Sequence, residues 1–558
     1  MTKSIHYKDK PWLNLYDTNV PESLTYEEVC LPEFLKRSST KFPDKMALLF
    51  EGYTLTYRQL DQMVDQCASA LTKMGIKKGT SVAILLPNLI PCVAAYYATL
   101  KIGAICVMNN PLYSDRELEH QFNDSKSRII ITLDLLVKRM VALRSKTLVK
   151  QIIYTSIGDY LPFPKNLLFP LIGPKKGLST KVTPASEVYK WKEFLKSGTE
   201  PPSEVPLSFE DVAMYQYTGG TTGVSKGVML THSNLSKQIQ QIATWFPAFN
   251  DDEIMIGALP FFHVFGLSCS MNLAIYCSWG NVLVPKPQPA FLLKAINKFR
   301  PTFVPLVPTM YIGMLNHPDI TKTDITSIKG CFSGSASMPQ EVIKAFEERT
   351  GATIVEGYGL TETCPVTHIN PFRGKRKVGS IGLPITDTKA RIVDLADGTT
   401  DMPVGKIGEL LIKGPQVMKG YWQQPEATAE ALSYDGWVRT GDIAKMDEEG
   451  YFYIVDRKKD MIISGGYNVY PRDIEEVFFG HPKVMEVCAI GVAHPTRGEA
   501  VKLFAVLKEG KTATKEELLE YCKDKLAKYK WPEEIEFRKE LPKSTVGKVL
   551  KKDLRQEG

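Results

Sequence analysis

Helix-like and strand-like hydrophobic patterns alternate along the first part of the chain. In 60–74, apolar residues recur at the i, i+3, i+4 spacing that gives a helix one apolar face. Gly75 follows at a position where helices commonly end, and the continuous apolar run 82–86 is typical of a buried strand. The same order, helix and then strand, recurs in 95–108 and 117–132. This alternation predicts an α/β fold with mainly parallel sheets covered by helices on both faces.

The pattern changes in the last third of the chain. Short strands separated by glycine and proline turns, 390–393, 408–412 and 451–455, predict a small β-barrel over about 373–456. After the charged connector 456–460, a helix that opens at Pro471 begins a pattern of mixed helices and strands. We therefore expect a large N-terminal domain, 1–458, and a small α+β C-terminal domain, 459–558.

Composition narrows the class of protein. A chain of 558 residues is too long for one hydrophobic core, and 44% hydrophobic with 23% charged residues is ordinary for a globular protein. The net charge of +7 comes without a basic patch that has interleaved aromatic residues, so no nucleic-acid partner is expected. No segment approaches the roughly 20 uninterrupted apolar residues of a membrane span, and the N-terminus lacks the apolar core of a signal peptide. The ten cysteines are scattered and the eight histidines show no metal-ligand spacing, which favours a cytoplasmic protein without a structural metal.

The run Tyr217–Gly227 carries the densest chemistry. It places four hydroxyl side chains besides the tyrosine, four glycines and one lysine directly after a short apolar stretch. Glycines let backbone N–H groups approach an anion, and hydroxyl groups and Lys226 add donors and charge, so the run suits a polyphosphate. It is not the common P-loop, because Val224 and Ser225 separate Gly223 from Lys226. A polar glycine-rich turn without a ligand remains the alternative for this run alone.

Two further segments, Glu356–Glu362 and Gly436–Asp442 with the following 451–471, complete a recognisable set. Their order and approximate distances resemble the adenylate-forming (AMP-binding) superfamily of acyl-CoA synthetases, firefly luciferase and peptide-synthetase adenylation domains. The resemblance runs from about residue 55 to residue 552. Within the superfamily, the chain is most similar to bacterial and archaeal long-chain fatty acid–CoA ligases, on the segments 109–113, 161–168 and 435–477.

The resemblance implies an ATP-dependent, AMP-forming acid–thiol ligase. A fatty acid of medium to long chain would react with ATP to give acyl-AMP and pyrophosphate, and CoA would then give acyl-CoA and AMP. An aryl- or other carboxylate–CoA ligase of the same fold is an alternative, and a non-catalytic nucleotide-binding protein is a remote one. The segment 261–263 lacks the aspartate with which amino-acid-activating relatives bind an ammonium group, which argues against a carrier-protein adenylation domain.

Residue roles follow from the same resemblance. Glu362 would bind Mg²⁺, Thr361 would meet the α-phosphate, Tyr358 would stack on adenine, and Asp442 with Arg457 would bind the ribose. The residues assigned to ATP or AMP are Thr218, Gly219, Gly220, Thr221, Thr222, Gly223, Ser225, Lys226, Gly334, Ser335, Ala336, Glu356, Gly357, Tyr358, Gly359, Asp442, Ile454 and Arg457.

The second domain would act through one lysine and one loop. Lys548 would enter the site during adenylation, and the domain would then rotate about the hinge residue Lys459. After rotation, the loop that contains Gly465, Gly466 and Tyr467 would line the tunnel for the CoA thiol. Without the resemblance, Lys548 would be one surface lysine among several.

The acyl site is the least defined part of the prediction. The resemblance puts His232 and His263 near it, with His232 as a catalytic candidate and His263 as a gate. A structural role is an equal alternative for either histidine. Trp245 and Gly266 complete the expected acyl pocket, with Phe246 and Phe249 as further candidates.

The segment 159–176 mixes bulky apolar residues with lysines and four prolines, which exclude a long regular helix across it. A surface loop packed on its own domain is the simpler reading. The alternative is peripheral contact with an anionic membrane, at the inner face of the plasma membrane, where fatty acids partition. Association of two copies of the chain as a homodimer is a further alternative.

Overall fold

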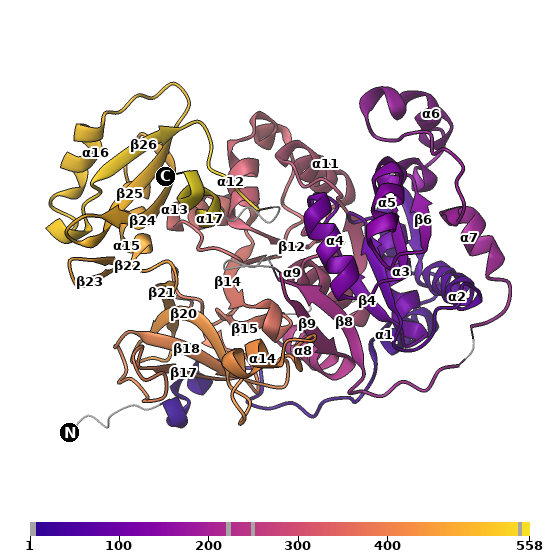
Figure 1. Cartoon of the computed structure of the whole chain (residues 1–558), viewed down its shortest axis with the longest axis horizontal. Helices are drawn as coiled ribbons and strands as arrows, with labels where there is room; N and C mark the ends of the chain where they lie inside the picture. The colour runs from indigo at the N-terminus through magenta and orange to yellow at the C-terminus, as the bar shows by residue number, and fades with distance from the viewer. Residues whose placement is uncertain (1–6, 203, 219–224, 247–251, 545–548, 558) are drawn as a thin grey trace.

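A computed structural model describes residues 7–202, 204–218, 225–246, 252–544 and 549–557, and it confirms the α/β fold (Figure 1). An eight-stranded sheet has the order β19-β9-β8-β4-β3-β5-β6-β7, parallel from β8 to β7. Its strands are β3 Ser81–Leu85, β4 Ile105–Met108, β5 Ile129–Leu133, β6 Gln151–Thr155, β7 Val188–Lys190, β8 Val212–Tyr217, β9 Gly227–Thr231 and β19 Gly420–Tyr421. Strand β9 pairs antiparallel with β8 on one side and with β19 on the other, so a segment from late in the chain closes this edge.

A nine-stranded sheet has the order β16-β15-β14-β13-β12-β10-β11-β1-β2. Its central strands run parallel, and antiparallel strands form both ends. The strands are β1 Met46–Phe50, β2 Tyr53–Thr56, β10 Ile254–Gly257, β11 Gly280–Leu283, β12 Phe303–Leu306, β13 Gly330–Ser333, β14 Thr353–Gly359, β15 Val366–Ile369 and β16 Leu383–Pro384.

Helices cover both sheets, as the alternating pattern predicts. They are α1 Leu31–Lys41, α2 Tyr57–Lys73, α3 Ile90–Lys101, α4 Asp115–Asp124, α5 Val137–Leu143, α6 Lys165–Ile172, α7 Trp191–Ser197, α8 His232–Trp245, α9 Val264–Gly266, α10 Leu273–Tyr276, α11 Pro289–Phe299, α12 Pro308–Asn316, α13 Gln340–Thr350 and α14 Pro425–Ala431. Helix α3 is buried from Ile90 to Leu100, which explains its apolar sequence. Helix α6 is short, as the prolines of 159–176 predict, but it includes Pro170. No helix in the described ranges is both long and apolar enough to cross a bilayer.

The region expected to form a small barrel contains a four-stranded antiparallel sheet, β17-β18-β20-β21. The strands are β17 Lys389–Val393, β18 Gly408–Lys413, β20 Val438–Met446 and β21 Phe452–Arg457. Among the described residues, β17 and β21 each pair with one strand of this sheet only, so the sheet has two edges and does not close into a ring. A bridge between Gly382 and Phe452 connects it to the start of β16.

The C-terminal part has a sheet and a hydrophobic core of its own. Its elements are β22 Ile462–Ser464, β23 Tyr467–Val469, α15 Pro471–Phe479, β24 Val484–His494, β25 Gly498–Leu507, α16 Lys515–Cys522, β26 Glu534–Arg538 and α17 Lys551–Glu557. Ile462 already belongs to this core, whereas the Lys458 N–H still bonds the Gly441 carbonyl of the preceding sheet at 2.9 Å. The predicted boundary near Lys459 lies between these two contacts.

Candidate active site

The two ends of the glycine-rich run meet at the edge of the eight-stranded sheet. Strand β8 leads into the run and β9 leads out of it, and the Thr218 N–H donates to the Lys226 carbonyl at 3.1 Å. The structure therefore places Thr218, Ser225 and Lys226 at the neck of one loop. The predicted contacts of Gly219, Gly220, Thr221, Thr222 and Gly223 lie outside the described residues.

Helix α4 packs against the neck of this loop, and the sequence analysis did not predict these contacts. His120 Nε2 lies 2.9 Å from the Ser225 carbonyl oxygen, and Gln121 Nε2 lies 3.4 Å from Ser225 Oγ. The Tyr217 hydroxyl donates to Asp124 Oδ2 at 2.5 Å. His120 and Asp124 are four residues apart, so they lie on one helix face, and this spacing of polar residues was the only signal in the sequence.

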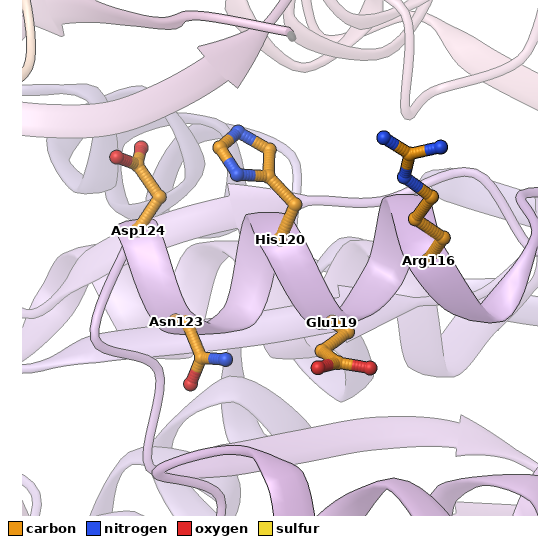
Figure 2. Close-up of a pocket in the computed structure, with 5 residues that line it drawn as sticks. All are labelled: Arg116, Glu119, His120, Asn123 and Asp124. Carbon is orange, nitrogen blue, oxygen red and sulfur yellow. The ribbon is translucent and has the colours of Figure 1, made fainter.

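A surface pocket of about 440 Å³ lies along the same helix, lined by Arg116, Glu119, His120, Asn123 and Asp124. Figure 2 shows Arg116, His120 and Asp124 projecting from one side of α4, and Glu119 and Asn123 from the other. The side that carries His120 is therefore the side that meets Ser225.

Tyr421 connects the predicted phosphate and metal residues. Its hydroxyl donates to Glu362 Oε1 at 2.8 Å, and Lys226 Nζ lies 4.8 Å from the centre of its ring. The Thr428 hydroxyl oxygen accepts from the Tyr421 N–H at 2.9 Å, which holds this residue beside β9. The structure thus brings Glu362 to the hydroxyl and Lys226 to the ring of one aromatic residue, although the two are far apart in sequence. Sequence reasoning missed Tyr421 because strand β19 is only two residues long and gives no periodic signal.

The three residues predicted for the nucleoside also lie together. The Tyr358 hydroxyl donates to Asp442 Oδ2, and Arg457 Nε lies 3.1 Å from Asp442 Oδ1. Asp442 is buried, and its backbone pairs with that of Arg457 across β20 and β21. Burial and the neighbouring Asp442 carboxylate raise the pKa of Tyr358 well above its usual value, so its hydroxyl stays protonated. A carboxylate held by a donor on each oxygen is well placed to accept from a sugar diol.

Glycines bring the walls of this site close to one another. A Cβ on Gly357 would lie 2.3 Å from the Phe332 ring, and a Cβ on Gly359 would lie 1.7 Å from the Pro365 carbonyl oxygen. A Cβ on Gly334 would touch the Phe265 ring at 3.2 Å. Gly357 and Gly359 have space for no side chain, so both have a packing role whether or not a nucleotide is bound.

Glu356 occupies a different environment from the one expected of a nucleotide ligand. Its carboxylate accepts from the Met338 N–H at 3.2 Å and from the Gly379 N–H at 3.0 Å. Burial raises its pKa, although these two hydrogen bonds act in the opposite direction. The side chain therefore ties two loops together, and a contact with ATP stays a prediction for this residue, as it does for Ser335, Ala336 and Ile454.

His232 is the first residue of α8 and is buried. Its ring Nδ1 accepts from the backbone N–H of Leu31 at 3.4 Å, and the backbone N–H of His232 donates to the Asp211 carbonyl at 3.1 Å. Burial lowers its pKa from 6.5 to about 4, so the imidazole is neutral at neutral pH. These contacts fit a structural histidine, and the catalytic role stays a prediction.

We expect His232 to make the protein less stable in mild acid. The unfolded chain takes up a proton near pH 6.5 and the folded chain only near pH 4, so the unfolded state binds more protons in this window and stability falls as the pH falls through it. The full contribution is about 3 kcal/mol. Urea unfolding at several pH values should show a shallower acid dependence for His232→Asn, whereas the control His494→Asn, at a partly exposed site beside Glu533, should keep the parent slope. If His232→Asn keeps the parent's dependence of unfolding free energy on pH, the lowered pKa of His232 does not cause the loss of stability in acid.

The other predicted acyl-site residues are closely packed. His263 Nδ1 accepts from the Phe265 N–H at 3.2 Å at the start of α9, and a Cβ on Gly266 would lie 2.4 Å from the Pro260 carbonyl oxygen. Trp245 is buried, donates from Nε1 to Thr386 Oγ1 at 3.2 Å, and packs edge-on against Tyr16. These contacts place Trp245 against the N-terminal segment, so its role as an acyl-pocket wall stays a prediction.

Arg472, at the start of α15, binds strand β21 just before the connector between the domains. The Arg472 N–H donates to Asp456 Oδ2 at 2.9 Å, and Arg472 Nη1 donates to the Ile454 carbonyl at 2.9 Å. Burial, with the nearby Arg457 charge, lowers the pKa of Lys459 to about 8. The hinge role of Lys459 stays a prediction. The predicted position of Lys548 lies outside the described residues.

The glycines of the predicted tunnel loop have free space around them. Gly465 and Gly466 have φ of +58° and +83°, and a Cβ on either would meet no atom within 4 Å. Tyr467 stacks on Tyr529 with ring centres 4.6 Å apart. The two glycines are therefore required by their left-handed backbone and not by crowding in this conformation.

Comparison with known proteins shows the family of the chain. The family model of AMP-binding enzymes matches residues 35–422, and the model of the AMP-binding enzyme C-terminal domain matches 473–548. The chain is 45% identical over 551 residues to a long-chain-fatty-acid–CoA ligase of Bacillus subtilis, with 98% of each chain covered.

Solved structures give the same result for the fold. ATP-bound MatB from Rhodopseudomonas palustris superimposes with a TM-score of 0.83 at 29% identity, covering 95% of this chain and 99% of the other. A fatty acyl CoA synthetase of Mycobacterium tuberculosis superimposes with a TM-score of 0.71 at 29% identity, covering 95% and 98%.

Proposed function

Because the chain belongs to the family of AMP-binding enzymes, as an ATP-dependent acid–thiol ligase, we propose that it converts fatty acids of medium to long chain into acyl-CoA. The observation that carries the proposal is the full-length similarity to a long-chain-fatty-acid–CoA ligase, since it includes both domains and the connector. ATP and CoA are the co-substrates of this reaction.

The first half-reaction needs positioning and charge neutralisation more than proton transfer. The fatty acid carboxylate attacks the α-phosphorus of ATP, a P–O bond forms, and pyrophosphate leaves with the electrons of the bond that breaks. Asp442 and Arg457 would orient the ribose, and Lys226 would lie against the β- and γ-phosphates. The CoA thiol then loses its proton to solvent, and the thiolate attacks the acyl carbonyl. A C–S bond forms, the bond between the acyl carbon and the AMP oxygen breaks, and AMP leaves.

Glu362 fits the Mg²⁺ that the family implies. One of its carboxylate oxygens is held by the Tyr421 hydroxyl, which orients the group. Mg²⁺ is commonly bound by one or two carboxylates together with substrate phosphates, and no cluster of three acidic, histidine or cysteine residues occurs in the described ranges. Bound there, Mg²⁺ would neutralise phosphate charge.

Pyrophosphate release with a panel of acids tests the substrate class. We expect kcat/KM to rise with chain length among saturated fatty acids and to be low for benzoate and other aromatic acids. A preference for aromatic acids would favour the aryl-CoA alternative. Failure of every acid to stimulate pyrophosphate release would favour a non-catalytic protein and would overturn the proposal.

Tyr421→Phe tests the residue that the structure adds to the site. Loss of a hydrogen bond to a charged carboxylate should leave Glu362 less well oriented and raise the Mg²⁺ concentration for half-maximal pyrophosphate release about tenfold. The control is Tyr26→Phe, which removes a tyrosine hydroxyl 2.7 Å from the Asp387 carboxylate, outside the candidate site. An equal Mg²⁺ dependence in both variants would make Tyr421 a packing residue only.

A further inference from the structure

Helix α6 and the turn after it expose a concentration of apolar side chains. Phe163, Leu171 and Leu167 are 78%, 70% and 65% exposed. The six large apolar residues exposed here are Phe163, Leu167, Leu168, Leu171, Ile172 and Leu178. Figure 1 shows α6 at the outer end of the N-terminal domain, beyond α5 and α11. Single exposed leucines are common in proteins, but a contiguous group marks an interaction surface.

The helix is fixed with this face outward. The Phe169 ring packs against Gly158, where a Cβ would lie 2.3 Å from it, and this aromatic residue is the half-buried member of the helix. On the other side, Lys165 Nζ lies 3.0 Å from Glu51 Oε2. One aromatic contact and one ion pair thus hold α6 on the domain, and turning the exposed residues inward would break both.

The surface is also basic. Residues 160–186 contain no aspartate or glutamate and four lysines, which are Lys165, Lys175, Lys176 and Lys181. Lys294 of α11 lies 3.8 Å from the same Glu51 oxygen that pairs with Lys165, so a further positive charge adjoins the helix. Exposed apolar residues flanked by lysines match the two layers of an anionic lipid surface. The apolar residues can enter the acyl-chain layer, and the lysines can meet the anionic headgroups.

We propose that α6 and the residues next to it, 163–181, dock the enzyme on an anionic phospholipid bilayer. With eight residues, α6 is too short to span a bilayer, so it would lie in the interface. The inference rests on the proposed function for its purpose: fatty acids partition into membranes, and docking would place the enzyme at its substrate.

Sedimentation with vesicles tests the docking without any need for catalysis. The full chain is mixed with vesicles of phosphatidylcholine alone or of phosphatidylcholine with phosphatidylglycerol, at low and at high salt. We expect binding to the anionic vesicles that weakens with salt. Replacing Leu167, Leu168 and Leu171 with serine should weaken it at least about tenfold, and Lys175→Glu with Lys176→Glu should weaken it only on anionic vesicles.

A matched control is the pair Phe479→Ser and Met485→Ser, which alters apolar residues that are 48% and 47% exposed in the C-terminal domain and should bind like the parent. All variants should keep the parent melting temperature and the parent rate with acid supplied below its solubility limit. Parent protein that stays in the supernatant at low salt, or serine variants that bind as the parent does, would overturn the proposal. Loss of a dimer in the serine variants, without a change in vesicle binding, would assign the surface to a second copy of the chain. Vesicle binding without acyl-CoA formation would separate failure of the proposed function from failure of the docking.

Discussion

Lys548→Ala is expected to slow acid-dependent pyrophosphate release several hundred-fold while it leaves the conversion of supplied acyl-AMP to acyl-CoA largely intact. The resemblance places the ammonium group of Lys548 at the carboxylate and phosphate oxygens during adenylation alone. One preorganised charge contact of this kind contributes about 3–4 kcal/mol to the stability of a transition state. Pyrophosphate release and acyl-CoA formation, assayed separately, measure the two half-reactions.

Lys552→Ala is the control for this prediction, because Lys552 is an exposed lysine close by in the chain. It should change neither half-reaction. Equal losses of both half-reactions in Lys548→Ala would remove this residue from the proposed role and would point to a general effect on the C-terminal domain.

The sequence predicted the elements with a clear period. The helix at 60–74 and the strand at 82–86 correspond to α2 and β3, and the switch from α3 to β4 follows the apolar run from Ile90 to Met108. Local sequence specifies these elements, because burial on one helix face leaves apolar residues at helical spacing and burial on both faces of a strand leaves a continuous apolar run. The pattern did not show that the sheet of β17, β18, β20 and β21 keeps two open edges, since the pairing of edge strands depends on the whole sheet.

The candidate site could be predicted only where its residues belong to a motif. Tyr358, Asp442 and Arg457 come from three motif segments, and the structure brings them within contact of one another. Tyr421 and His120 act through strand pairing and helix packing between distant segments, which no local pattern records. Glu356 shows a different limit: its place in a motif predicts a nucleotide ligand, and the motif gave no sign that its carboxylate also accepts hydrogen bonds from the Met338 and Gly379 N–H groups.

Lys459→Pro and Gly466→Leu are expected to slow the second half-reaction, whereas Lys548→Ala slows the first. Proline fixes φ near −65° at residue 459, which should restrict rotation of the C-terminal domain about the connector. Leucine at 466 has open space around its Cβ in the present conformation, so its bulk should act when the loop arrives at the thiol tunnel. Both variants should form acyl-AMP at close to the parent rate and transfer it to CoA at least about tenfold more slowly.

Each variant of this pair has a control that separates its effect from general damage. Lys459→Ala removes the amine and keeps the backbone free, so it should transfer the acyl group faster than Lys459→Pro. Gly510→Leu imposes the same backbone strain as Gly466→Leu, because Gly510 has φ of +72° and an equally open Cβ position in the same domain. If Gly510→Leu slows thioester formation as much as Gly466→Leu does, strain and not obstruction is the cause. Parent rates of acyl transfer in both Lys459→Pro and Gly466→Leu would show that this chain completes the second half-reaction without the rotation that its family resemblance implies.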